Sequence, residues 1–125
     1  MKKRPNVTQK LILKYKDRIL MFRRKNGAYD FPGGRLEFLE SPLSALKREL
    51  KEELNFDLKS EPRPFYVWNY VSKDKKRHSI MLYYRHRLKK KENFASPEGM
   101  KILWLRKREM NKIILDKSFI DRIYE

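Results

Sequence analysis

The 125-residue chain has no cysteine, which excludes a disulfide framework and thiolate metal sites. It also lacks long hydrophobic runs, since no apolar stretch approaches the roughly 18 residues that cross a bilayer. No segment is rich enough in glycine, proline or serine to act as a linker, and there is no internal repeat. These absences predict a single soluble domain over residues 1–125, located in the cytoplasm.

Acidic residues are scarce beside basic ones, because 32 Lys and Arg stand against 16 Asp and Glu and give a formal net charge of +16. Such a charge concentrates anions, so it favours nucleotides, nucleic acids or acidic membrane surfaces as partners. The short basic runs, taken singly, are typical of solvated loops. Without a spanning segment we expect no membrane insertion. The composition leaves the oligomeric state open between monomer and homodimer.

Alternating β-branched and aromatic residues predict strands, and a leucine-rich segment predicts a helix. The predicted strands are 8–15, 18–25, 64–71, 78–88 and 101–107, with a loop over 26–34 and helices over 41–54 and from about 108 to 124. Strand pairs separated by a central helix and followed by a terminal one are typical of a mixed α/β (α+β) domain.

The central helix has a clear start, because Ser41 is a good N-cap and Pro42 suits the first helical position. Glu49, Glu52 and Glu53 lie together about 110° from its leucine stripe, at the border of core and solvent. Like charges on one face repel each other. Taken alone, they fit an ordinary charged surface as well as a site for Mg²⁺ or Mn²⁺, which carboxylate oxygens suit.

The loop and helix together resemble the Nudix hydrolase signature: a glycine, five residues, a glutamate, seven residues, then R-E-U-x-E-E-x-G-U with U hydrophobic. Gly34 and Glu40 match the first two fixed positions, and residues 48–53, RELKEE, match the next. Asn55 replaces the final glycine, which a helix end in the left-handed conformation tolerates. Leu39 stands where relatives often carry another glycine. We expect both departures to leave the acidic face intact.

The resemblance implies an α/β/α sandwich with a mixed central sheet, a catalytic loop and helix, and a C-terminal helix. It also implies hydrolysis of a P–O–P bond in a nucleoside diphosphate linked to another group. Bound Mg²⁺ or Mn²⁺ neutralises such a substrate and lowers the pKa of an attacking water. One of the three glutamates is the implied general base, and Glu49 is the first candidate. Arg48 would steady the glutamates and Glu40 would support the loop. The implied metal ligands are Glu49, Glu52, Glu53 and the Gly34 carbonyl.

Further roles outside the signature follow from the same resemblance. Arg23 and Arg24 close the second strand, where relatives often contact phosphate; plain edge charges are the alternative. Glu98 stands where some relatives place an additional metal ligand or base. One face of a strand presents three aromatic residues, Tyr66, Trp68 and Tyr70. Such rings stack on a nucleobase or pack in the core.

Two functions remain open at this point. The first is an Mg²⁺-dependent pyrophosphohydrolase acting on (d)NTPs, on other nucleoside polyphosphates or on RNA 5′ ends. The second is a nucleic-acid-binding Nudix module with weak or incidental catalysis, which the net charge of +16 and the aromatics among basic residues support. The repulsive glutamate face favours the enzyme, because a pure binding module gains nothing from it.

Overall fold

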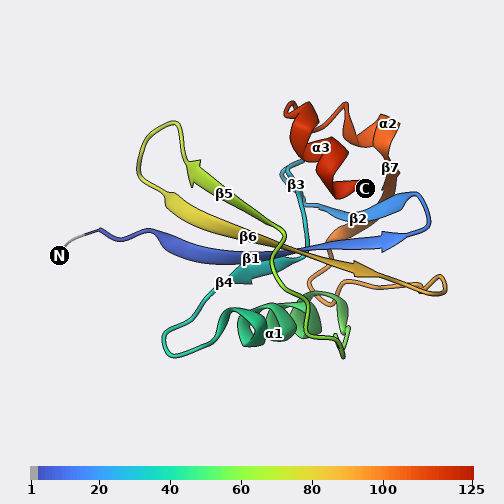
Figure 1. Cartoon of the computed structure of the whole chain (residues 1–125), viewed down its shortest axis with the longest axis horizontal. Coiled ribbons are helices and arrows are strands. Elements are labelled where there is room, and N and C mark those ends of the chain that lie inside the picture. Colours follow the sequence, from blue (N-terminus) through green and yellow to red (C-terminus); the bar gives the residue numbers. More distant parts are fainter. Residues whose placement is uncertain (1–2) are drawn as a thin grey trace.

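A mixed sheet between helices forms the body of the protein in the computed structural model, which describes residues 3–125 (Figure 1). Its strands are β1 (Asn6–Tyr15), β2 (Arg18–Arg23), β3 (Tyr29–Asp30), β4 (Gly33–Arg35), β5 (Tyr66–Val71), β6 (His78–Arg87) and β7 (Lys101–Arg106). The helices are α1 (Pro42–Leu54), α2 (Lys107–Met110) and α3 (Lys117–Ile123). Because α1 covers one face and α2 and α3 the other, the predicted α/β sandwich with a mixed sheet is confirmed.

Strand β1 organises the sheet. It runs parallel to β6 along nearly its whole length, and its other edge pairs with two different strands. Near its start Gln9 lies opposite Gly34 of β4, and near its end Lys14 lies opposite Ile19 of β2. The predicted pair of strands around the polar turn therefore exists, but β2 soon leaves β1 to pair with β7 and β3. It also ends at Arg23, two residues earlier than predicted.

The prediction of a plain loop over 26–34 is wrong in part, because β3 and the start of β4 lie within it. Gly33 has a φ of 134°, and a Cβ atom there would overlap the Gln9 carbonyl. Only glycine permits so close an approach of two backbones. The Leu11 amide also donates to the Pro32 carbonyl at 2.8 Å, which fastens this segment to β1.

The tail from about residue 108 to 124 is helical as predicted, but it forms two short helices and not one. The chain leaves the helical path after Met110, and α3 starts afresh at Asp116. The Asp116 carboxylate accepts a hydrogen bond from the Phe119 amide at 3.1 Å, so it caps α3. Aspartate favours such a cap over a helix interior, which explains why α3 begins directly after Asp116.

Each face of the sheet has its own apolar core. On the α1 side, Leu46, Leu50 and Leu54 pack against Leu11 and Leu13 of β1, as the leucine stripe predicts. The opposite core joins the sheet to α2 and α3 through Met110, Phe119, Ile120 and Ile123. Within residues 3–125 no helix has the length and apolarity that a membrane crossing requires.

Both ends of α1 have the predicted caps. The Ser41 hydroxyl accepts a hydrogen bond from the Ser44 amide at 3.2 Å. At the other end Asn55 adopts the left-handed conformation with a φ of 53°, and its amide donates to carbonyls of the last helical turn. Leu39 also has a positive φ, of 70°, although it is not glycine and its side chain is 90% exposed. Leucine there carries backbone strain without a packing gain.

We expect Leu39→Gly to stabilise the protein by about 0.5–1 kcal/mol, because relief of the left-handed strain exceeds the extra freedom of glycine in the unfolded chain. Denaturant unfolding measures the change. Phe38→Gly is the matched control, since Phe38 is 93% exposed but has an ordinary φ. That variant should lose about 0.5–1 kcal/mol. Equal effects of the two substitutions would contradict the account of strain at Leu39.

Candidate active site

Arg48 lies at the centre of the acidic cluster that α1 and the preceding loop create. Its Nε and Nη2 atoms donate to the two carboxylate oxygens of Glu40 at 2.7 and 3.0 Å. Its Nη1 donates to Glu49 Oε1 at 2.9 Å and lies 3.5 Å from Glu52 Oε2. Nη2 also donates to the Arg35 carbonyl at 3.1 Å. The planar guanidinium therefore ties the loop to the helix and offsets the repulsion among the carboxylates.

The electrostatics of the cluster reflect these contacts. The hydrogen bond from Arg48, and then that from the Glu37 amide, lower the pKa of Glu40. The reciprocal bonds to Glu40 and Glu49 raise the pKa of Arg48. Arg48 thus keeps its charge throughout, and Glu40 is held ionised as its partner.

Glu53 is the buried member of the cluster, with only 4% of its surface exposed. Its Oε1 accepts a hydrogen bond from the Gly33 amide at 2.7 Å. Burial raises the pKa of Glu53 to about 7; the charges of Glu49 and Asp30 act in the same direction, and Lys10 opposes them. A carboxylate in this position carries negative charge that the protein alone compensates poorly.

Gly34 has a local reason to be glycine. A Cβ atom at this position would clash with the carboxylate of Glu49, so the backbone of β4 and that carboxylate lie in direct contact. Glu52, one residue before Glu53, is the exposed member, since 54% of its side chain is open to solvent. The three glutamates thus range from buried to exposed across one helix face.

Sequence reasoning missed the residues that flank this cluster on β1 and β3. The Lys10 ammonium is buried, 2.9 Å from Asp30 Oδ1, and donates to the Phe31 carbonyl at 3.2 Å. The other Asp30 oxygen accepts from Arg24 at 2.8 Å. Gln9 is fully buried, and its amide has no hydrogen-bond partner within residues 3–125. Polar residues within an otherwise buried strand were the available signal.

A hollow of about 620 Å³ lies beside this network and brings together only some of the predicted substrate-binding residues. Arg24 and Trp68 line it, as does Tyr70. Arg23 does not line it, and its guanidinium lies over the ring of Tyr29, 5.3 Å from the centroid. The other lining residues include Lys10, Asp30, Arg35, Arg77, His78 and Tyr83.

Tyr66 and Glu98 lie away from the hollow. Tyr66 packs into the core, with its ring 5.2 Å from that of Phe119 and 6.1 Å from that of Tyr83. Glu98 is exposed in the turn before β7. The hydrogen bond to Asp30 is the main cause that raises the pKa of Arg24, and the charges of Asp30, Glu53 and, least of all, Glu98 act in the same direction.

Comparison with solved structures shows where this fold occurs. The MutT protein of Methanosarcina mazei Go1 has a TM-score of 0.81 at 16% identity, covering 98% of this chain and 95% of that one. The E. coli dihydroneopterin triphosphate pyrophosphohydrolase has a TM-score of 0.76 at 16% identity, covering 94% and 91%. A Francisella tularensis bifunctional NMN adenylyltransferase/ADP ribose pyrophosphatase, complexed with AMP and a Mn ion, has a TM-score of 0.72 at 24% identity, covering 89% of this chain and 37% of that one.

Comparison with curated proteins gave no match. The family model described as NUDIX domain, by contrast, matches residues 3–124. That match spans the sheet, the acidic cluster and both helical faces, and it confirms the resemblance seen in the signature. The chain therefore belongs to the Nudix family, and its enzyme class is pyrophosphohydrolase.

Proposed function

We propose that the protein hydrolyses a P–O–P bond of a (d)NTP or another nucleoside polyphosphate with the help of Mg²⁺ or Mn²⁺. The observation that carries this proposal is the position of the carboxylate cluster beside a hollow lined by aromatic and basic residues. Arg35 links the two, because its carbonyl accepts from Arg48 and it also lines the hollow. An anionic phosphate chain and a flat base each find complementary groups within this one region.

The residues present fit a hard divalent cation. Carboxylates and a backbone carbonyl are its preferred donors, and the buried Glu53 carries charge that a cation would offset. Within residues 3–125 no three acidic or histidine side chains converge on one point, because Arg48 holds Glu49 and the Gly33 amide holds Glu53. We propose that the ligands are Glu49, Glu52, Glu53 and the Gly34 carbonyl. The cation would supply Lewis-acid stabilisation of the phosphate charge. Glu98 is a further candidate, because it stands where some relatives place an additional metal ligand.

The chain's own residues would then divide the work. Glu49 would accept the proton of the attacking water, because its side chain is partly exposed and is oriented by the hydrogen bond from Arg48. Arg24, held by Asp30, would present its remaining donors to phosphate. Trp68 and Tyr70 would stack on the base, whereas the contacts of Tyr66 favour a packing role and those of Arg23 favour an edge charge.

The names of two similar proteins support a phosphorylated compound with a heterocyclic base as the substrate class. One is described as acting on a triphosphate and another is complexed with AMP and a Mn ion. A binding module with incidental catalysis would need neither an arginine that holds three acidic side chains together nor a fourth carboxylate that is buried. RNA 5′ ends stay within the proposal, as longer substrates that contain the same P–O–P bond. A cytoplasmic location also remains a prediction from the cysteine-free composition.

One prediction concerns the stability of metal-free protein and the protonation of Glu53. Its raised pKa means that the folded state holds the proton more tightly than the unfolded chain. The associated stability is fully present below about pH 4.5 and is lost as the pH rises through about 7. Glu53→Gln removes that loss. In EDTA at pH 8.5, the free energy of unfolding of the variant should therefore exceed that of the native protein by up to about 3 kcal/mol. The gain should vanish near pH 4.5. Thermal unfolding at both pH values measures it.

Glu52→Gln serves as the control, because it makes the same chemical change at an exposed position of the same helix face and relieves no buried charge. Added Mg²⁺ or Mn²⁺ should raise the melting temperature of the native protein, since a ligand that binds only the folded state stabilises it. In Glu53→Gln this rise should be smaller. A variant that is less stable than the native protein at pH 8.5, or that gains equally from metal, would contradict the role given to Glu53.

A further prediction separates Glu49, the proposed general base, from Glu52, which is proposed to bind metal alone. Glu49→Gln should lower kcat by about 10²–10⁴-fold, and excess Mg²⁺ should not restore it, because no general base remains. Glu52→Gln should lose activity at low Mg²⁺ and recover part of it at high Mg²⁺, because only affinity for the ion is weakened. Release of pyrophosphate or phosphate from a panel of nucleotides, with and without Mg²⁺, measures both.

Glu61→Gln is the matched control, since Glu61 is an exposed carboxylate outside the cluster, and it should behave as the native protein does. Rescue of Glu49→Gln but not of Glu52→Gln by Mg²⁺ would exchange the two roles. If both variants keep full activity and Glu98→Gln does not, the base lies in the turn before β7. Silence over the whole panel would overturn the proposed function.

A further inference from the structure

A second concave region lies at the turn between β1 and β2, far from the carboxylate cluster. Two hollows, of about 340 and 470 Å³, flank this turn, and both are lined by Lys16, Asp17 and Arg106. Gln9 marks the catalytic end of β1, since it pairs with Gly34. Lys16 comes seven positions after Gln9, just past the end of the strand, which corresponds to about 23 Å of extended chain. The region is therefore distinct from the proposed active site.

Cations dominate these hollows, which we call the basic end. Asp17 is the only acidic residue among those that line them, and its Oδ2 lies 3.3 Å from Arg106 Nε. Lys107 pairs with Asp121 at 2.7 Å. Within residues 3–125 no acidic side chain forms an ion pair with Lys16, Arg18 or Lys91. The eight basic lining residues are Lys14, Lys16, Arg18, Arg87, Lys91, Arg106, Lys107 and Arg108.

The crowding of these charges is visible at Lys14. Its ammonium is buried, donates to the main-chain oxygen of Glu125 at 2.9 Å and lies 5.7 Å from the centroid of the Tyr124 ring, and the charge of Glu125 offsets its own in part. Burial first, and then the neighbouring charges of Arg87 and Arg85, lower the pKa of Lys14. An anion at the basic end would relieve this repulsion.

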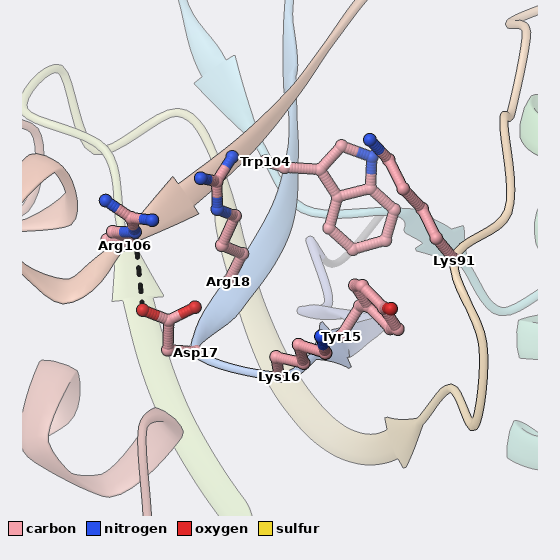
Figure 2. Close-up of a pocket in the computed structure, with 7 residues that line it drawn as sticks. All are labelled: Tyr15, Lys16, Asp17, Arg18, Lys91, Trp104 and Arg106. Carbon is pink, nitrogen blue, oxygen red and sulfur yellow. Dashed lines mark ion pairs between the residues drawn. The ribbon is translucent and has the colours of Figure 1, made fainter.

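Aromatic side chains form part of the smaller hollow. Figure 2 shows Trp104 between the side chains of Arg18 and Lys91, with Tyr15 beneath them. Both rings are anchored: Trp104 stacks on Phe94 with centroids 6.3 Å apart, and Lys16 lies 5.6 Å above the Tyr15 ring. Rings held beside cations can stack on a nucleobase, while the cations pair with the phosphates of the same strand.

We infer that the basic end binds single-stranded nucleic acid. An unpaired base can enter a hollow flanked by Tyr15 and Trp104, while the phosphates on either side meet the cations of the two hollows. A duplex keeps its bases stacked inside and would leave the rings unused. A lipid surface fits less well, because the large exposed apolar residues of the described chain lie elsewhere; they include Phe38, Leu39, Val67, Val71 and Leu115.

This inference does not depend on the proposed hydrolysis, so the test uses a strand that the active site has no reason to cleave. The probe is a fluorescein-labelled twelve-nucleotide uridine RNA with a 5′ hydroxyl. We expect saturable binding by fluorescence anisotropy. The double variant Arg18→Ala/Lys91→Ala should weaken it about tenfold and reduce the slope of log Kd against log salt by about 1.4, for two lost phosphate contacts. Both residues are exposed, so the fold should survive.

Lys59→Ala/Arg63→Ala is the matched control, because it removes the same charge from exposed positions outside the hollows and should change Kd less than twofold. The stacking is tested in Trp68→Phe, where Trp104 is the sole tryptophan and RNA should quench its fluorescence. Equal loss of affinity in the two double variants, or no quenching of Trp104, would overturn the inference. So would binding of an RNA duplex, inorganic polyphosphate or anionic vesicles as tightly as the single strand.

Discussion

The close contact of the Gly33-Gly34 backbone with its neighbours is the constraint on which the site depends. On one side Gly33 lies against the Gln9 carbonyl, and on the other Gly34 lies against the Glu49 carboxylate. A side chain at either position would push the helix or the strand away. The same approach lets the Gly33 amide reach Glu53, so a buried carboxylate has a donor where the sheet meets α1. The spacing between sheet and helix thus sets the positions of the acids.

Arg48 provides the electrostatic counterpart of that steric constraint. Without it, Glu40, Glu49 and Glu52 would repel one another on adjoining turns of the chain. Its guanidinium is fully engaged, with Glu40 bound through two nitrogens and Glu49 through the third. A lysine has a single ammonium group and could not hold the loop and the helix in one plane. The helix face is therefore acidic but organised, which suits a site that receives a cation.

Features that depend on near neighbours in the chain could be predicted from the sequence. Ser41, Asn55 and most leucines of α1 act within a few residues and are confirmed; Leu43 is the exception, since it is only half-buried and outside the core cluster. Pairings between distant segments could not be predicted in the same way. The early departure of β2 from β1, the addition of β4 to β1 and the Lys10–Asp30 ion pair all depend on how remote segments meet. The hollow beside the Lys10–Asp30 pair is such a product, which explains why Arg24 and Trp68 line it while Arg23 and Tyr66 do not.

Strand β1 also relates the two charged regions of the molecule. It carries two buried lysines, Lys10 and Lys14, four residues apart and hence on the same face of the strand. Lys10 shares the Asp30 carboxylate with Arg24, so its charge is compensated in part by a side-chain carboxylate. Lys14 donates to the Glu125 main-chain oxygen and lies over the Tyr124 ring, and its neighbouring charges include Arg85 and Arg87 as well as Glu125. The excess charge of the chain is therefore not spread evenly. It leaves the carboxylate site free to attract a cation and gathers at the opposite end of β1, where a polyanion gains most from it.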